Sequence, residues 1–134
     1  MISNIINTNM LNLLLRLYIL LTLLSVLNSH PVVQDLDISR FMGKWYVIAL
    51  IPNWVEGDGE NSYDEYKLNE DGTIDITYYS RKDGKEKSIK QKGFVDENET
   101  GRWEVQFLKP YIPFYSAPYE LIILDSDYSY MVVG

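Results

Sequence analysis

The sequence contains no cysteine, so it offers no disulfide bridges, thiolate metal ligands, cysteine nucleophiles or the lipid-modified cysteine of bacterial lipoproteins. Histidine is nearly absent as well, because His30 is the single one and lies beside Pro31, ahead of any predicted strand. Catalysis needs positioned acids, bases or nucleophiles, and the remaining candidates are carboxylates typical of a solvated surface. We therefore expect no catalytic residue, no metal site and no cofactor.

Positive charge is also scarce, with 12 Lys and Arg against 19 Asp and Glu and a net charge of -7. Binding to nucleic acid depends on basic side chains that neutralise phosphates, so we expect no nucleic acid partner. The same balance disfavours attraction to an anionic membrane by net charge alone.

Residues 1–29 are rich in leucine and form a segment unlike the rest of the chain. After Arg16 the uninterrupted apolar run is about 11 residues, which suits the core of a signal peptide better than the roughly 20 residues of a membrane-spanning helix. Ser29 is the small residue at the expected cleavage point, and an uncleaved membrane anchor beginning near Met10 is the alternative. We predict a signal peptide or membrane anchor over 1–29 and a folded domain over 30–134.

From residue 44 onward, short alternating apolar runs are separated by turn residues, without a long segment of helical period. The 11 Tyr, 3 Trp and 4 Phe suit half-buried pleated surfaces, so the class is all-β. The predicted strands cover residues 44–51, 61–68, 73–80, 85–95, 102–108, 119–124 and 128–134. Three prolines between residues 109 and 118 argue against a central strand, so we expect a loop there.

A short helical turn is predicted over residues 36–42, where Asp37 or Ser39 can cap backbone N–H groups and Gly43 can end the turn. With Trp45 two residues after Gly43, this stretch resembles the G-x-W signature of the lipocalins. In that family a short 3₁₀ turn crosses the closed end of a β-barrel, and the tryptophan plugs that end. We accordingly expect Trp45 to be buried.

A second stretch, residues 124–134, resembles the lipocalin segment at the turn between the last two predicted strands. Its motif residues are Asp125, Asp127 and Tyr128, which the resemblance places beside Trp45 at the closed end. Together the two signatures, in the right order, are similar to the bacterial lipocalin and apolipoprotein D branch over residues 35–134.

The resemblance implies an up-and-down antiparallel lipocalin-type barrel with about seven of its eight strands present. The eighth strand, the arginine that it carries to stack on the signature tryptophan, and the C-terminal helix have no counterpart. We interpret the sequence as truncated before the last strand, that is, as a fragment. The alternative is a partner chain, such as a second copy in a dimer, that covers the open edge strands.

The function implied by the resemblance is binding and transport of a small hydrophobic ligand, such as a fatty acid or lysophospholipid, in a β-barrel calyx. The implied location is secreted, periplasmic or associated with the outer membrane. Two alternatives remain open: a lipocalin-like enzyme such as an isomerase, and an envelope protein that contacts another chain through its open sheet edge.

Strand alternation selects the residues expected to line the calyx, although those nearest the closed end are expected to pack as solid core. They are Val47, Ala49, Asp64, Tyr66, Leu68, Ile74, Ile76, Tyr78, Ile89, Val105, Phe107, Leu121 and Ile123. For Asp64, a bulge that turns the carboxylate outward is the alternative. The aromatic residues expected at the mouth, as a ligand gate or a membrane-dipping patch, are Trp54, Tyr111, Phe114 and Tyr115.

Overall fold

The computed structural model describes residues 2–27, 30–51, 59–109 and 111–134, and the chain divides into two units, Met1–Pro31 and Val32–Gly134. The first unit contains helix α1, Ile2–Leu27. Within the described ranges, no helix combines the length and hydropathy needed to cross a membrane. The assignment of residues 1–29 as a signal peptide or anchor stays a prediction.

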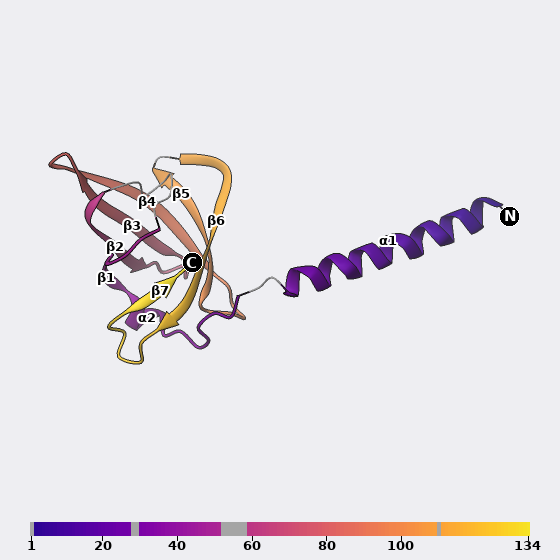
Figure 1. Ribbon diagram of the computed structural model, residues 1–134, viewed down its shortest axis with the longest axis horizontal. Helices are drawn as coiled ribbons and strands as arrows, with labels where there is room; N and C mark the ends of the chain where they lie inside the picture. The colour runs from indigo at the N-terminus through magenta and orange to yellow at the C-terminus, as the bar shows by residue number, and fades with distance from the viewer. Residues whose placement is uncertain (1, 28–29, 52–58, 110) are drawn as a thin grey trace. The chain divides into compact units, whose positions relative to one another are not determined.

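The second unit is a single curled sheet of seven strands (Figure 1). Every hydrogen-bonded neighbour is also the next strand along the chain, and every pair is antiparallel. The strands are β1 (Gly43–Tyr46), β2 (Glu60–Leu68), β3 (Ile74–Lys82), β4 (Lys85–Val95), β5 (Arg102–Lys109), β6 (Tyr111–Leu124) and β7 (Met131–Val133). The predicted all-β up-and-down meander is confirmed.

The strand before the first hairpin loop is shorter than predicted, since β1 ends at Tyr46 and not near residue 51. Beyond it, the N–H of Val47 donates to the Ser62 carbonyl oxygen at 3.0 Å. The β2–β3 register shifts between Glu60 and Tyr63, where Asn61 has a positive φ of 50°. This bulge bends β2 at the residues that would pair with a longer β1, so the β1–β2 ladder ends there.

The loop predicted over residues 109–118 is wrong, because β6 begins at Tyr111 and contains Pro113 and Pro118. Among the described residues this part of β6 pairs with β5 alone, whereas β7 pairs with residues 121–124. A proline has no N–H to donate, and in a strand with one neighbour its nitrogen can face away from the ladder. The prolines are therefore compatible with this edge of the sheet.

One end of the curled sheet is closed by α2, Ile38–Phe41, which lies away from the β3–β4 hairpin (Figure 1). Asp37 caps it by accepting a hydrogen bond from the Arg40 N–H at 3.2 Å. The Phe41 N–H donates to the Asp37 carbonyl oxygen, four residues earlier, so the turn is α-helical and not 3₁₀ as expected. Gly43, at φ +109°, then turns the chain into β1.

Phe41 is the centre of the core above α2, with none of its side chain exposed. Its ring lies 5.2 Å from that of Trp45, 5.1 Å from that of Tyr66 and 5.3 Å from that of Trp103. Around this cluster pack Leu36, Ile74, Ile76, Val105 and Leu121.

Trp45 is only half-buried, which corrects the prediction that it is buried at the closed end. It stacks on Phe41, and its Nε1–H donates to the Phe41 carbonyl oxygen at 2.8 Å. Trp45 lies on β1, an edge strand that has a hydrogen-bonded neighbour on one side only in the described sheet. Of the two tryptophans that the structure describes, Trp103 is the more buried, at 1% exposure.

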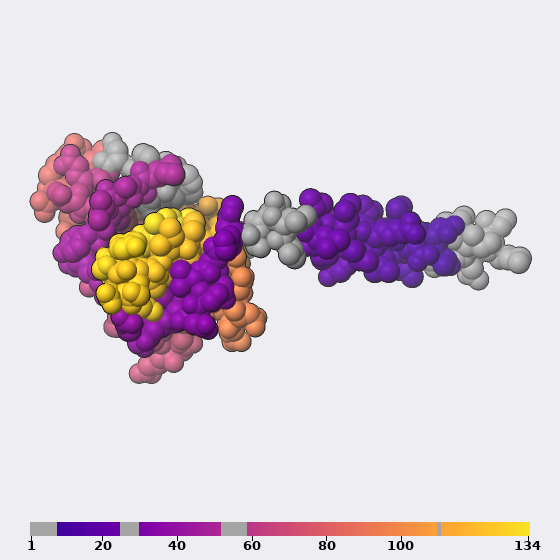
Figure 2. All heavy atoms as spheres, turned by 60° about the horizontal axis from the view of Figure 1, so that its bottom comes forward, coloured from indigo at the N-terminus to yellow at the C-terminus, as the bar shows by residue number. Residues whose placement is uncertain are grey.

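The segment before α2 is hydrogen-bonded to the last two strands and the turn between them, which are distant in sequence. The Val33 N–H donates to the Leu121 carbonyl oxygen at 2.8 Å, and the Asp37 N–H donates to the Tyr128 hydroxyl at 3.0 Å. The Arg40 guanidinium lies 4.1 Å from the Tyr128 ring centroid. Figure 2 shows this segment packed against the β6–β7 turn.

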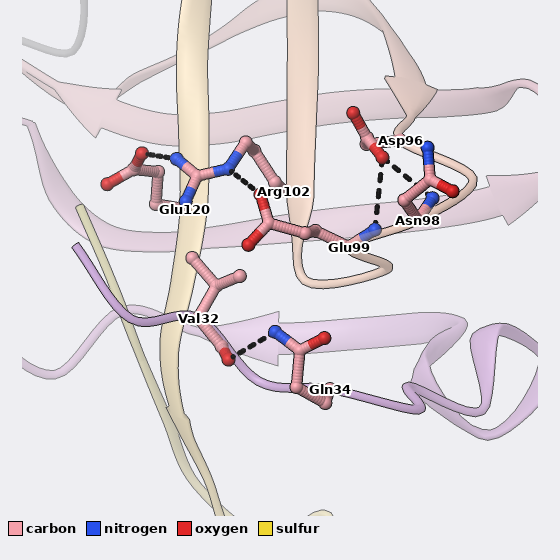
Figure 3. A network of polar contacts seen from close by, with 7 residues as sticks. All are labelled: Val32, Gln34, Asp96, Asn98, Glu99, Arg102 and Glu120. Atoms are coloured by element: carbon pink, nitrogen blue, oxygen red, sulfur yellow. Dashed lines mark hydrogen bonds and ion pairs between the residues drawn. The ribbon is translucent and has the colours of Figure 1, made fainter. Parts of the chain in front are cut away.

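The β4–β5 turn belongs to the same closed end and is held by charged side chains (Figure 3). Arg102 pairs with Glu99 at 2.9 Å and with Glu120 on β6. Asp96 accepts hydrogen bonds from the N–H groups of Asn98 and Glu99. The closed end is thus fastened both by ring packing inside and by polar contacts outside.

Candidate functional site

A mainly apolar cavity of about 710 Å³ opens within the curled sheet. This volume lies in the range of pockets that hold small organic ligands. Its lining comes from every strand except β1 and β3, together with the segment that follows β1. The lining residues are Val47, Ala49, Leu50, Ile51, Asp64, Gln91, Val105, Phe107, Tyr115, Ala117, Pro118, Tyr119, Val132, Val133 and Gly134.

The ladders explain why these side chains share one face. Asp64 is the direct partner of Trp45 on β1 and of Tyr78 on β3, and directly paired residues point to the same side of a sheet. Val105 on β5 pairs with Ala117 on β6 in the same way. The Phe107 and Tyr115 rings stack at 5.9 Å between centroids, which makes one wall aromatic.

The structure brings several of the predicted calyx residues together in this lining. They are Val47, Ala49, Asp64, Val105 and Phe107, joined by Tyr115 from the group expected at the mouth. For Asp64 the geometry favours the inward orientation over the outward one. Their role in binding a ligand stays a prediction.

A second group of predicted calyx residues forms the packed core and does not line this cavity. Tyr66, Ile74, Ile76 and Leu121 belong to the cluster around Phe41. Tyr78 is also buried, and its hydroxyl has no hydrogen-bond partner among the described residues. These side chains point inward as alternation predicts, but near the closed end the strands leave no open space between them.

Three predicted residues lie outside both groups. Leu68 is 39% exposed at the end of β2, and Ile89 is half-buried without contributing to the lining. Ile123 is 48% exposed because the β6–β7 register shifts between Leu121 and Ile123. After that bulge Leu124, and not Ile123, packs against the core.

The aromatic residues expected at the mouth are dispersed. Tyr111 is exposed on β6, and Phe114 is fully exposed with a positive φ of 58°, so neither reaches the cavity lining. Trp54 lies outside the described residues. Of the motif residues at the closed end, Asp125 accepts hydrogen bonds from the Ser129 hydroxyl and the Asp127 N–H.

Sequence reasoning missed Gln91, the 117–119 segment and the contribution of β7. Residues 85–92 are almost entirely polar, so alternation gives no sign of which β4 side chains face inward. Ala117 and Pro118 fall in the segment predicted as a loop. The inward proline-containing stretch is recognisable only once β6 is known to pair with β5.

The polar groups of the lining are few. Tyr119 shares a hydrogen bond with the core residue Tyr66, their hydroxyl oxygens being 2.8 Å apart. Asp64 supplies the one acidic side chain and Gln91 an amide, and no lysine, arginine or histidine is among the lining residues that the structure describes. Nor does any group of three or more metal-ligating side chains occur in the described ranges.

A meander sheet curled around an apolar cavity, with a short helix closing one end, defines a calyx-type β-barrel protein. The family model described as a lipocalin-like domain matches residues 36–134. The chain therefore belongs to the lipocalin family, as the two signatures predicted.

The chain is also similar to individual lipocalins. It is 28% identical to temperature-induced lipocalin-1 of Arabidopsis thaliana over 109 residues, which is 77% of this chain and 59% of that protein. It is 31% identical to the outer membrane lipoprotein Blc of Vibrio cholerae, over 76% of this chain and 60% of that protein. It is 31% identical to mouse apolipoprotein D, over 74% of this chain and 51% of that protein. The similarity to Blc and to apolipoprotein D confirms the predicted branch. The chain spans about three-fifths or less of the length of these relatives.

Proposed function

We propose that the protein binds and transports a small hydrophobic ligand, an acyl-chain lipid such as a fatty acid or lysophospholipid, in the cavity of the second unit. The observation that carries this proposal is the apolar cavity of about 710 Å³ above a closed, packed end. Membership of the lipocalin family supports it.

The affinity would come from the hydrophobic effect. Each methylene transferred from water to an apolar surface contributes about 0.8 kcal/mol, so an alkyl chain of about ten carbons needs few polar contacts to be held. The lining suits such a chain because most of it is aliphatic and aromatic. Transport, unlike catalysis, requires nothing further of these residues.

A location outside the cytoplasm, in the periplasm, at the outer membrane or in the secreted fraction, is part of the same proposal. It is supported by the leucine-rich N-terminal segment and by the similarity to Blc, which is an outer membrane lipoprotein. Exposed apolar side chains at the open end, including Ile51 and Phe114, are compatible with membrane association.

The test is a fluorescence titration with an uncharged naphthylamine dye and displacement by alkyl lipids. Ala117→Trp places a large ring in the cavity, and we expect the dye affinity to fall about tenfold or more, because the ring occupies the volume of several methylenes. The matched control is Ser116→Trp. Ser116 is the residue next to Ala117, but it is exposed and is not part of the lining.

Saturable binding by the wild type and the control, together with loss in Ala117→Trp, supports the proposal. Absence of dye binding by the wild type, or equal binding by all three proteins, contradicts it. Circular dichroism in the far ultraviolet verifies that each variant keeps its β-sheet.

A further inference from the structure

The β3–β4 hairpin concentrates positive charge at the end of the curled sheet opposite α2, which we call the open end. Residues 81–92 contain six Lys and Arg against two Asp and Glu, a net charge of +4 in a chain whose net charge is -7. Residues 81–88 and Lys90 are exposed, whereas Lys92 is half-buried and pairs with Asp75. Half of the 12 basic residues of the chain thus lie in this hairpin.

The turns at the closed end carry charge of the opposite sign. The β2–β3, β4–β5 and β6–β7 turns, residues 69–73, 96–101 and 125–130, contain seven Asp and Glu and no Lys or Arg. In an up-and-down meander these three turns lie at one end of the sheet, and the β3–β4 turn lies at the other. The charge of the second unit is therefore separated along the strand direction.

The open end stays positive when its other charged residues are counted. The β1–β2 connection together with Glu60 adds three acidic residues, and Lys109 adds a basic one, which leaves these segments with a net charge of +2. Exposed charges more than about 8 Å apart are largely screened at physiological salt. At contact with a surface, the charge of the open end consequently matters more than the net charge of the chain.

The strand register shows that the hairpin projects beyond the strand next to it. Lys90 and Lys109 form the first β4–β5 pair, so residues 85–89 pair with β3 alone among the described residues. Figure 1 shows the hairpin extending from the sheet at the end away from α2. Lys90 and Lys109 are both exposed, and like charges directly opposite one another weaken a ladder. An anionic surface at this end would reduce their repulsion.

Exposed apolar side chains occur at the same end. Ile48, in the segment that follows β1, and Phe114, near the start of β6, are almost fully exposed, and Tyr111 is more than half exposed. Basic side chains beside exposed apolar ones suit the interface of a lipid bilayer, where the charges meet anionic headgroups and the apolar groups enter the acyl boundary. A soluble polyanion would offer no partner to the apolar side chains.

We propose that the open end of the second unit docks onto an anionic lipid bilayer, with the β3–β4 hairpin on the headgroups and Ile48 and Phe114 in the acyl boundary. The inference goes beyond the proposed function, because these residues lie outside the cavity lining. Docking in this orientation turns the cavity mouth towards the membrane and the acidic closed end away from it. A hydrophobic ligand could then pass between bilayer and cavity with little exposure to water.

The experiment places an environment-sensitive nitrobenzoxadiazole label at either end of the sheet in the full chain. The sequence has no cysteine, so Phe114→Cys and Ser126→Cys, the latter an exposed position in the β6–β7 turn, each give one labelling site. Each protein is titrated with vesicles of phosphatidylcholine alone and of equal parts phosphatidylcholine and phosphatidylglycerol. We expect the emission of the label at position 114 to shift to the blue with the anionic vesicles, and the label at position 126 to stay unchanged.

Charge removal on the hairpin tests its role. A basic residue near an anionic surface contributes about a fivefold factor, so Lys85→Gln combined with Lys87→Gln should raise the half-saturating lipid concentration about tenfold or more. Lys85→Gln alone should raise it about fivefold. The matched control for this single variant is Lys67→Gln, the same change at an exposed position of β2 near the closed end, which should have little effect. Residues 1–29 contain only Arg16 as a charged side chain, so binding through that segment would not depend on the hairpin lysines.

Three outcomes would overturn the proposal. They are an equal response of the label at position 114 to both kinds of vesicle, an equal shift of the labels at positions 114 and 126, and an equal effect of Lys85→Gln and Lys67→Gln. Phe114→Asn separates a bilayer from a soluble polyanion, because it should weaken vesicle binding in sedimentation but leave binding to a sulfated polysaccharide unchanged. If Phe114→Asn binds vesicles as the wild type does, the hairpin serves a soluble polyanion and the bilayer proposal falls. If the lysine variants fail to fold, the labels on the otherwise unaltered chain still decide.

Discussion

At the scale of single residues, the fold depends most on Phe41, which joins the one-turn helix α2 to the sheet by contacting three aromatic rings. Phe41→Ala should cost about 3–5 kcal/mol of unfolding free energy, because it empties a fully enclosed ring site. Trp45→Ala should cost less, since Trp45 is half-buried at the edge strand. Urea unfolding of both variants measures the difference, and an equal or larger loss for Trp45→Ala would contradict this assignment.

The residue scale also shows how far alternation predicts the inner face. On β3 the buried residues Ile74, Ile76 and Tyr78 follow a strict period of two, and the same holds for Val105 and Phe107 on β5. Prediction failed for Ile123 because an extra residue in the β6–β7 ladder reverses the side-chain direction. A bulge depends on the partner strand, so it leaves no local signal in the sequence.

At the scale of elements, three turns at the closed end are held by aspartates. The Thr73 hydroxyl and N–H lower the pKa of Asp71, the N–H groups of Asn98 and Glu99 lower that of Asp96, and the Ser129 hydroxyl lowers that of Asp125. Each bond is formed with the ionised carboxylate in the folded state. The unfolded chain lacks these donors, so its aspartates keep ordinary pKa values.

The resulting pH dependence has a definite sign. Since the folded pKa values lie below the ordinary value of 3.8, the stabilisation is complete above that pH and is lost as the pH falls through the folded values. We expect the thermal midpoint to decrease below about pH 4. The combined variant Asp71→Asn, Asp96→Asn and Asp125→Asn should show a shallower decrease, and Glu65→Gln serves as a single-site control on an exposed strand position. An acid profile identical to that of the wild type would argue against the turns as its source.

The elements show a second limit of sequence reasoning. The boundaries of β4 were predicted to the residue because turn chemistry flanks the strand on both sides. The start of β6 was missed because of its prolines. A proline excludes a strand only where neighbouring strands on both sides need its N–H groups, and the sequence does not show how many neighbouring strands a segment has.

At the scale of the whole molecule, the sheet has two open edges, since no ladder between β1 and β7 is present in the part of the chain that the structure describes. Both strands are short, and Val132 and Val133 beside the cavity are exposed. Water can therefore reach the cavity from this side. Closure of the sheet would remove that access.

A variant extended after Gly134 by a turn and a strand from a related lipocalin should accordingly bind the dye more tightly. Shielding two more methylenes is worth about 1.6 kcal/mol, or about tenfold in Kd. The control carries the same extension with two prolines in the strand, which prevents pairing. Equal, tight and saturable binding by all three proteins would indicate that the chain closes in another way, most simply by pairing with a second copy, and native mass spectrometry would detect the dimer.

The hydrogen bond between the Asp37 N–H and the Tyr128 hydroxyl joins residues 91 positions apart, whereas every ladder joins consecutive strands. Each hairpin therefore forms by closing a short loop. The contact of α2 with the β6–β7 turn joins residues so far apart in sequence that almost the entire domain must be in place first. We expect the closed end to assemble late in folding and to open early in unfolding. Backbone amides of Asp37 and Phe41 should then exchange with deuterium sooner than those of β3 and β4. In partly unfolded molecules, water would reach the core at the closed end, opposite the cavity mouth.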